Sequence, residues 1–354
     1  MAAVTGRIEP MDIEQLKFAV SPWELLMRQM APGRLSARLD FVQVGGILLN
    51  HERWSHRIVA TGATPPGYLV LAGGYSAETT FTWCEGKVSA GVLAYGSDSA
   101  EIDFVVPDNG EHWVVLVPRD LLIDHLGDET AAAVLRSGHL LRCEPSLGRR
   151  LSALVDRALL RSRAHGGSQT DDRVLAAIKS QVLVTVAEVL LGSHESVGRS
   201  TPRKRYQAFR RAIRYADAAR HAVSPPELAD AAGVSQRVLQ LSFQEALGVA
   251  PEKFLRWNRM NGMHRELRHS HATTDSVTEI AQRWHFKELG RTAVEYRRLF
   301  GESPSETLSR DCQLHGIRLA DALVQATRTP GRKIRKSASQ QLRSLSHEAS
   351  PARG

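Results

Sequence analysis

One short helical pattern occurs twice in this chain, about fifty residues apart. The first copy begins at Ser224, which with Glu227 has the spacing of a capping box and predicts the start of a helix. That helix ends at Gly233, because glycine adopts a left-handed turn without steric cost. Ser235 then predicts the cap of a second helix. The apolar residues at helical spacing on the buried face of this second helix are Leu239, Phe243 and Ala246.

The second copy follows at an offset of 52 residues, since Ala281 occupies the place of Ala229. Ser276 and Glu279 repeat the capping-box spacing, and His285 stands where the first copy has its turn glycine. The segments that close the two copies are residues 248–251 and 301–304, at an offset of 53. Such self-similarity indicates a duplicated structural unit, here two pairs of short helices that are each joined by a tight turn.

Two such units joined by a helix have the dimensions of a DNA reader. A recognition helix fits the major groove, and successive major-groove faces lie about 34 Å apart along one side of the duplex. The predicted connecting helix, residues 251–267, is about 25 Å long at the standard rise per residue. The sequence therefore predicts two recognition helices held on adjacent turns of DNA.

The stretch from about residue 203 to 310 resembles the DNA-binding domain of AraC/XylS-type bacterial transcription regulators. The residues that carry the resemblance in the first copy are Leu228, Ala229, Gly233, Val234, Ser235, Leu239, Phe243, Leu247, Gly248 and Pro251. Those in the second copy are Val277, Thr278, Glu279, Ile280, Ala281, Trp284, Phe286, Leu289, Gly290, Arg291, Tyr296, Arg297, Phe300, Gly301, Pro304, Ser305 and Leu308. Two residues depart from the family pattern: His285 replaces the usual turn glycine, and Asn258 replaces an apolar residue of the connecting helix.

The excess of positive over negative charge is confined to the C-terminal half. Residues 203–310 contain 19 Lys and Arg against 12 Asp and Glu, and residues 311–354 contain 8 against 3. Because the whole chain carries +8, residues 1–202 carry −4. This segregation is typical of a module that binds a polyanion and is attached to a part that does not.

The three cysteines, Cys84, Cys143 and Cys312, are widely separated and show neither metal-ligand spacing nor a disulfide framework, which favours a reducing compartment. Residues 1–11 lack the apolar core of a signal peptide, and we find no run of about 18 apolar residues that would span a bilayer. We therefore expect a cytoplasmic protein without a membrane partner.

Residues 12–118 read mainly as short strands separated by turn residues. The apolar runs are residues 39–44, 46–49, 57–60, 67–72, 79–83 and 113–117. Many short strands at regular spacing predict a sandwich or small barrel, and the resemblance implies a cupin-like sensing domain here. The expected fold class is α+β: an N-terminal cupin-like β-barrel or sandwich, a helical connector and a C-terminal all-α domain with two helix-turn-helix units.

A small barrel can enclose one ligand, and a pocket is usually apolar with a few polar groups. The candidates for lining it are Trp54, Tyr68, Trp83 and Trp113, with His51 and His56 as polar candidates. Each of these residues can equally be an ordinary core or surface residue. The dense His and Glu pattern of metal-binding cupins is missing, so we expect no metal and no cofactor.

The predicted domains are a β-rich effector domain at residues 1–143, a helical connector at 144–192, a linker at 193–203, the double helix-turn-helix domain at 204–310, and a basic, largely disordered tail at 311–354. Residues 119–140 are also expected to be helical, and a short helical pattern covers 314–326. The second connector helix is apolar over much of its circumference and must be covered, either within the chain or by a second subunit. The resemblance implies a homodimer, with RNA polymerase as a further candidate partner.

Outward residues of the two recognition helices divide by their chemistry. Arg bonds bidentately to guanine and Gln to adenine, while apolar residues can contact the thymine methyl group. The base-reading candidates are Gln236, Arg237, Gln240, Leu241, Arg291 and Val294. The phosphate-binding candidates are Gln244, Lys287, Arg297 and Arg298. Arg210, Arg211 and Arg214 face outward on the preceding helix and are further candidates for phosphate contact.

The sequence therefore predicts a sequence-specific DNA-binding transcription regulator whose N-terminal domain senses a small molecule of unknown identity. The chain has no nucleophile motif and no phosphate-cradling glycine loop, so an enzyme is not expected. Two alternatives remain open: a cupin-type enzyme with an accessory DNA-binding domain, and a regulator that responds to protein contact without a small-molecule ligand.

Overall fold

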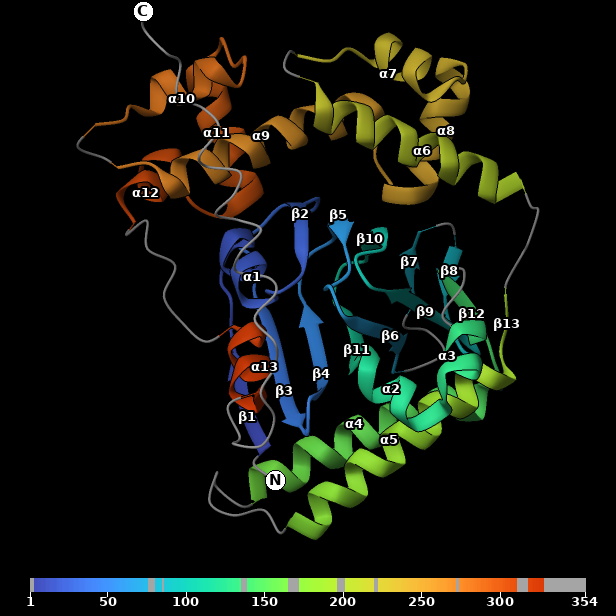
Figure 1. Ribbon diagram of the computed structural model, residues 1–354. Coiled ribbons are helices and arrows are strands. Elements are labelled where there is room, and N and C mark those ends of the chain that lie inside the picture. Colours follow the sequence, from blue (N-terminus) through green and yellow to red (C-terminus); the bar gives the residue numbers. More distant parts are fainter. Residues whose placement is uncertain are drawn as a thin grey trace, which may run out of the picture.

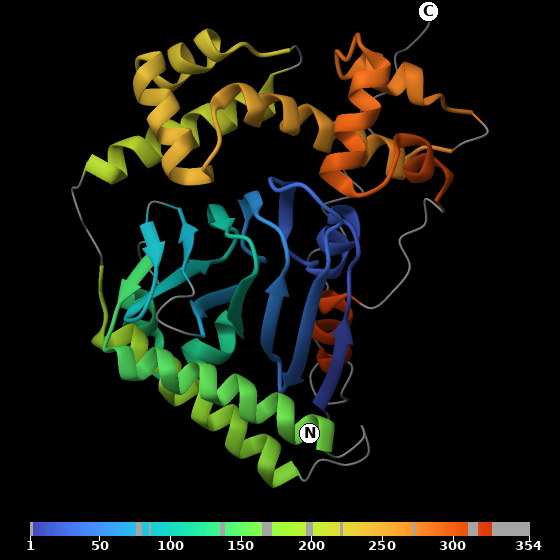
Figure 2. The same ribbon diagram turned by 180° about the vertical axis from the view of Figure 1, so that it is seen from behind.

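The computed structural model arranges the chain in three layers (Figure 1). It describes residues 3–75, 80–84, 86–134, 139–164, 172–195, 201–219, 222–271, 274–310 and 318–327. A β-domain lies in the middle, a pair of long helices covers one side of it, and the helix-turn-helix part lies across the opposite side. Figure 2 shows the same three layers from behind.

The β-domain is a two-sheet structure whose strand pairs are antiparallel throughout the described residues. The larger sheet follows the order β1-β3-β4-β11-β6-β9-β12-β13 and the smaller sheet the order β2-β5-β10-β7-β8. The strands of the larger sheet are β1 (Ala3–Ile8), β3 (Ala37–Val44), β4 (Ile47–Trp54), β6 (Tyr68–Gly74), β9 (Val92–Ser97), β11 (Gly110–Pro118), β12 (Leu140–Arg142) and β13 (His194–Glu195). Those of the smaller sheet are β2 (Glu24–Gln29), β5 (Ile58–Ala63), β7 (Phe81–Trp83), β8 (Gly86–Val88) and β10 (Glu101–Val106).

Side chains alternate across the larger sheet and divide the interior into two cores. On β11, Val114 and Leu116 belong to the core between the two sheets. Trp113 and Val115 point the other way, into the core beneath the long helices. This alternation follows from the two-residue repeat of a strand, and it means that the larger sheet is buried on both faces.

The helical layer consists of α4 (Pro145–Ala164) and α5 (Asp172–Gly192), with α2 (Arg119–Leu126) and α3 (Asp128–Val134) beside them (Figure 1). Residues 173–192 of α5 are long and apolar enough to cross a membrane, by length and composition alone. That finding differs from the sequence analysis, which found no such run. Several α5 side chains, among them Val182, Val186 and Val189, are buried in the core against the larger sheet, which accounts for the apolar composition.

The C-terminal part contains the two expected helix-turn-helix units. Its helices are α6 (Thr201–Ala218), α7 (Pro225–Ala232), α8 (Gln236–Leu247), α9 (Pro251–His269), α10 (Val277–Arg283), α11 (Leu289–Phe300) and α12 (Pro304–Ser309). The first unit packs its core around Phe209, Phe243 and Phe254, and the second around Tyr296 and Phe300. Helix α9 runs between the two units (Figure 1); Trp257 on α9 packs against both cores.

The chain returns to the β-domain after the second unit. Helix α13 (Leu319–Thr327) packs Leu319, Ala322 and Leu323 into the core between the two sheets, and the Ala320 N–H donates to the carbonyl of Ser21 at 2.6 Å. Helix α13 agrees with the short helical pattern expected at 314–326, whereas its packing into the β-domain was not predicted. The rest of the expected tail, residues 311–317 and 328–354, lies outside the described residues, as do residues 196–200 of the expected linker.

Several local expectations need correction. Strands β1, β2, β8, β9, β10 and β13 were not predicted, and Leu140, expected at the end of the helical stretch 119–140, begins strand β12. Ser224 and Glu227 form a complete capping box, whereas Ser276 only accepts from the Glu279 N–H. His285 has φ +61°, so it adopts the left-handed turn of the glycine that it replaces. Strands β2, β9 and β10 each contain consecutive apolar residues that were a usable signal, whereas β1 and β8 mix glycine, polar and apolar residues and give a weak one.

Candidate functional site

The first recognition helix, α8, presents a continuous polar face to solvent. Ser235 caps the helix by accepting from the Val238 N–H, and Gly248 ends it with φ +67°. Leu239 and Phe243 hold the buried face in the first core. The candidates are all exposed, so no part of the chain that the structure describes covers them: Gln236, Arg237, Gln240, Leu241 and Gln244.

The second recognition helix, α11, also exposes its candidates, but Arg291 and Arg297 pair with neighbouring carboxylates, Arg297 with Glu306 at 3.3 Å. The exposed candidates are Arg291, Val294, Arg297 and Arg298, with Lys287 just before the helix. Arg291 pairs with Glu295 at 3.1 Å and with Glu288 at 3.6 Å. Val294 is 71% exposed, the highest value among the large hydrophobic side chains that remain exposed in the described residues.

Glu295 is the shared acid of this face. Its carboxylate accepts from Arg256 on α9 as well as from Arg291. Burial acts to raise the pKa of Glu295, but the hydrogen bonds from Arg256 and Arg291 outweigh it, so its pKa lies below the usual range. Arg291 is therefore held by the carboxylates of Glu295 and Glu288, and any ligand of its guanidinium has to compete with them.

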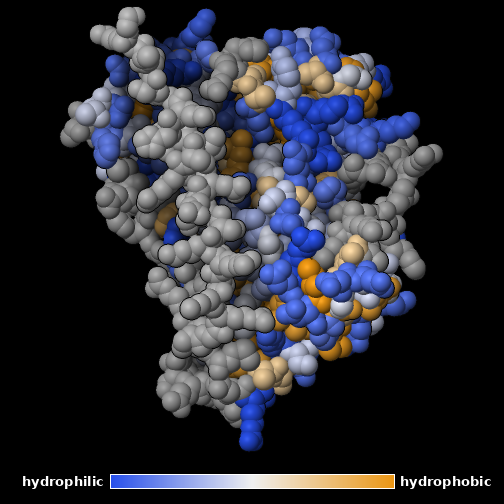
Figure 3. All heavy atoms as spheres, in the orientation of Figure 1, coloured by the Kyte–Doolittle hydropathy of each residue, from blue (hydrophilic) through white to orange (hydrophobic). Residues whose placement is uncertain are grey.

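Of the three α6 arginines, Arg211 and Arg214 are exposed as expected, but all three have partners within the chain. Arg210 is only 15% exposed and pairs with Asp103 of β10, and Arg214 pairs with Glu101 of the same strand at 2.8 Å. The Arg211 Nε donates to the carbonyl of Ala232 at 2.8 Å. These side chains therefore join α6 to the β-domain and to α7. Figure 3 shows hydrophilic side chains gathered along α6 on the visible face of the molecule.

Asp103 lies at the centre of this contact. The Tyr206 hydroxyl donates to it at 2.7 Å. Burial raises the pKa of Asp103 in spite of the opposing effects of Arg210 and Tyr206, and burial likewise raises the pKa of Tyr206. The β-domain and the first helix-turn-helix unit are thus joined by buried polar groups. The sequence did not reveal which of these groups contact each other.

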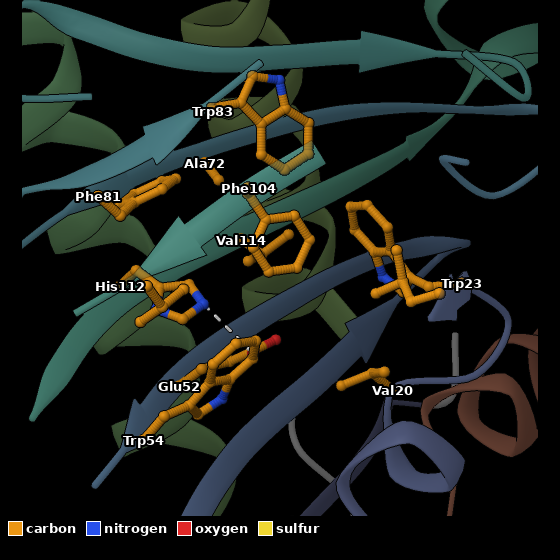
Figure 4. Close-up of a pocket in the computed structure, with 12 residues that line it drawn as sticks. Val20, Trp23, Glu52, Trp54, Ala72, Phe81, Trp83, Phe104, His112 and Val114 are labelled. Carbon is orange, nitrogen blue, oxygen red and sulfur yellow. Dashed lines mark ion pairs between the residues drawn. The ribbon is translucent and has the colours of Figure 1, made fainter. Parts of the chain in front are cut away.

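A second candidate site is an apolar pocket between the two sheets, shown in Figure 4. Its cavity volume is about 30 Å³. The lining residues are Val20, Trp23, Leu25, Glu52, Trp54, Ala72, Phe81, Trp83, Phe104, Val106, His112 and Val114. Trp83 stacks on Phe104 with ring centroids 5.6 Å apart, and Trp23 meets Trp83 edge-on at 6.3 Å.

One ion pair is buried in this apolar lining. Glu52 and His112 face each other across β4 and β11 in direct register. The Glu52 Oε2 and His112 Nε2 atoms lie 3.4 Å apart (Figure 4). The Nδ1 of His112 and the Nε1 of Trp54 are buried without a hydrogen-bond partner. Since buried polar atoms are normally satisfied, these two are the best-placed groups for a ligand or an ordered water.

Two of the four aromatic ligand candidates line the pocket, and two do not. Trp54 and Trp83 are lining residues. Trp113 is completely buried on the opposite face of β11, in the core beneath α4 and α5. Tyr68 is half-buried at the start of β6 and packs against the outside of the core between the sheets. Successive side chains of a strand point to opposite faces of the sheet. Without the pairing register of the strands, an aromatic residue could therefore not be assigned to the pocket side or to the side beneath the helices.

The two histidine candidates also lie elsewhere. His51 contacts Glu111 at 2.7 Å and Tyr75, beneath the long helices, while His56 contacts Ser55 and the carbonyl of Pro32. Glu52 and His112 were not among the predicted site residues, although a Glu and a His on neighbouring strands were a usable signal. Among the described residues, no group of three or more His, Cys, Asp or Glu side chains is placed to hold a metal ion.

Comparisons with known proteins agree on the C-terminal part. Residues 228–310 match a family model described as a helix-turn-helix domain. A probable thc operon regulatory protein of Rhodococcus erythropolis is 44% identical over 102 residues, which are 28% of this chain and 30% of that protein. The XylDLEGF operon transcriptional activator 2 of Pseudomonas putida is 31% identical over 115 residues, which are 32% of this chain and 71% of that protein.

Among solved structures, a probable AraC family transcriptional regulator from Rhodopseudomonas palustris is 35% identical, with a TM-score of 0.27, and the match covers 29% of this chain and 95% of that chain. The chain thus spans under a third of the Rhodococcus relative, but more than two thirds of the Pseudomonas one.

Proposed function

Because the chain belongs to the AraC/XylS family of transcription regulators, we propose that it binds DNA sequence-specifically and regulates transcription. The observation that carries the proposal is the pair of recognition helices, α8 and α11, whose outward side chains are all exposed. Helix α9 between them has 19 residues and is about 28 Å long at the standard rise. That length suits two adjacent turns of the major groove, which are about 34 Å apart.

The roles of the exposed residues follow from their chemistry. Gln236, Arg237, Gln240, Leu241, Arg291 and Val294 read bases in this proposal, and Gln244, Lys287, Arg297 and Arg298 hold phosphates. Base contacts give sequence preference, whereas phosphate contacts give affinity that falls steeply with salt. The basic excess of residues 203–310 supports the same division.

Selection of bound duplexes from a random pool, followed by footprinting, tests the proposal. We expect two protected segments on one face of the duplex, about one helical turn apart. A single protected half-turn, or equal binding to random DNA and to the selected sequence, would contradict the proposal.

The Arg237→Ala substitution tests the assignment of a base contact. It should relax preference at one base pair, at a cost of about 1–3 kcal/mol in discrimination, and leave binding to random DNA nearly unchanged. Competition binding with the selected site and single-base variants measures this. An equal loss on cognate and random DNA would make Arg237 a phosphate contact.

We propose further that the pocket between the sheets takes a small effector. Its aromatic walls and the unpartnered ring nitrogens of His112 and Trp54 favour a flat, apolar molecule that carries a hydrogen-bonding group. The present cavity volume of about 30 Å³ is enough for ordered water, so a larger effector enters only if lining side chains move. Quenching of tryptophan fluorescence by a panel of small aromatic alcohols and ketones tests this. No saturable change with any of them would favour a regulator controlled by protein contact.

The remaining parts of the proposal concern assembly and chemistry. We propose a cytoplasmic homodimer that forms through α4 and α5, because Leu160, Val184 and Leu191 are exposed there; sedimentation that shows a monomer at micromolar concentration would refute it. RNA polymerase is a candidate partner of the DNA-bound form.

We also propose that the protein acts by binding and not by catalysis. Stoichiometric iron, manganese or zinc in the purified protein would instead favour the cupin-type enzyme.

A further inference from the structure

The two recognition helices end at equivalent positions, and both ends meet the β-domain. Gly248 follows α8 and Gly301 follows α11, at the offset of 53 residues that relates the two copies. Both glycines have φ near +70°. The last carbonyl groups of a helix have no partner within the helix and must find one elsewhere. Here the β-domain supplies partners to both helices.

At the end of α8, the partner is Arg57. Its guanidinium donates to the carbonyl of Leu247, and it is held in place by Asp108 at 3.2 Å. A cation at this end is also favoured by the helix dipole. The fit is close, since a Cβ added to Gly248 would lie 3.1 Å from the Arg57 Nη1.

At the end of α11, the partners are Gln29 and Gly33. The Gly33 N–H lies 3.0 Å from the carbonyl of Arg298 and 3.1 Å from that of Leu299. The Gln29 Nε2 donates to the same Leu299 carbonyl at 2.7 Å. A Cβ added to Gly301 would lie 2.8 Å from the Cβ of Arg34, so the chain after α11 packs directly on this loop.

The middle of α9 is held by β2, the strand that ends at Gln29. The Asn261 side chain accepts from the Gln29 N–H at 2.8 Å and donates to the Gln29 carbonyl at 3.0 Å. The neighbouring Arg28 donates to Asn258 at 2.6 Å and pairs with Asp217 of α6. Arg28, Gln29 and Asn261 are each 1% exposed. Asn258, which departs from the family pattern, is therefore an acceptor for the β-domain.

We propose that Arg28, Gln29, Gly33 and Arg57, here called the spacing clamp, hold the two recognition helices at one separation and thereby set which spacing of two DNA half-sites binds tightly. The two units have separate cores on the two halves of α9, with Trp257 packed against both, so a third body that contacts both units opposes any tilt of one unit against the other. The β-domain is that third body, and the spacing clamp is its contact with both units. Gln29 and Arg57 act as positioning residues and contact no DNA.

This inference rests on the proposed function, and its test varies the DNA. The selected site is rebuilt with its two half-sites moved apart or together in steps of one base pair, and full-length protein is titrated against each duplex. Wild-type protein should show one sharp optimum. Arg57→Ala should lose about tenfold in affinity at that optimum, the scale of one hydrogen bond from a charged group, and less than about twofold at the other spacings, which flattens the profile.

Arg53→Ala is the matched control. Arg53 lies in the same domain, is about half exposed and pairs with Glu111, so its loss should leave the wild-type profile unchanged. Gln29→Leu is the second variant and should flatten the profile from the α11 side; its thermal melting curve shows whether it folds. Arg57→Lys keeps the cation and should restore part of the optimum.

The possible outcomes separate cleanly. A profile of wild-type shape in Arg57→Ala, an equal loss at every spacing, or a gain at every spacing each overturns the spacing clamp. Failure of wild-type protein to prefer any sequence would instead refute the proposed function, and it would appear before any variant is compared.

Discussion

At the scale of single residues, the second helix-turn-helix unit is organised around a histidine without access to water. His264 is 1% exposed, and its Nδ1 lies 2.7 Å from the Tyr296 hydroxyl. That hydroxyl donates to Thr307 at 2.9 Å, and Thr307 donates to Glu302 at 2.7 Å. Glu302 in turn pairs with Arg310. A neutral His264 with its proton on Nδ1 completes this chain of donors.

The buried histidine predicts a pH-dependent stability. Burial, helped by Arg268 and Arg310, lowers the pKa of His264 from 6.5 to about 3. The unfolded chain therefore takes up a proton below about pH 6.5 that the folded chain does not, so stability is complete above that pH and falls as the pH drops towards 3. The free energy of unfolding should fall by about 1.4 kcal/mol per pH unit in this window.

Urea unfolding of wild-type protein and of His264→Phe, at pH 7 and pH 5, measures this effect. The drop between the two pH values should be about 2 kcal/mol larger in wild-type protein. His269→Asn, an exposed change on the same helix, should behave as wild type. Equal drops in wild-type protein and His264→Phe would show that His264 does not carry the pH dependence.

At the scale of elements, α9 has to serve both units and the β-domain at once. Its buried residues lie on several sides: Phe254 faces the first core, Met263 the second, and Asn261 the β-domain. Gly262 lies in the middle of this helix, where glycine is normally unfavourable by about 1 kcal/mol relative to alanine. Its presence has a local reason, because a Cβ there would lie 2.2 Å from the ring of Trp284.

Gly262→Ala should therefore destabilise the protein although it improves helix propensity. The Trp284 ring is fixed by a hydrogen bond to Glu266 at 2.7 Å, and forcing a methyl group against a fixed ring costs about 1–3 kcal/mol. Gly290→Ala on α11 is the control, since a Cβ there meets nothing within 4 Å and should be neutral or stabilising by up to about 1 kcal/mol. Unfolding midpoints that move in the same direction for both variants would contradict this account of Gly262.

At the scale of the whole molecule, the DNA-binding part is tied to the β-domain from both of its ends. Helix α6 follows the connector and pairs with β10 through Arg210 and Arg214. Helix α13 follows the second unit and fills the core between the sheets with Leu319 and Leu323 (Figure 1). The β-domain, not the helix-turn-helix part, is therefore completed by the last described helix.

Truncation tests this role of α13. Removing residues 318–354 should destabilise the β-domain by roughly 3 kcal/mol or more, since burying one leucine side chain contributes about 1.5–3 kcal/mol. Removing residues 328–354 alone keeps α13 and should change the unfolding free energy little. Leu319→Ala should lose about 2–4 kcal/mol. Two truncations of equal stability, measured in urea, would show that α13 contributes nothing to the core.

The sequence by itself determined whatever depends on residues near each other in the chain. Ser224, Ser235 and Gly233 specified helix ends through local hydrogen bonds and backbone freedom, so the duplicated unit and its outward residues were predictable, and the α+β fold class with them. Tertiary structure alone decided which polar groups meet across the domains. Arg210 could not be told from a phosphate contact, nor Trp113 from a pocket residue, because strand register and domain docking bring together residues distant in sequence, and a single sequence carries no record of those pairings.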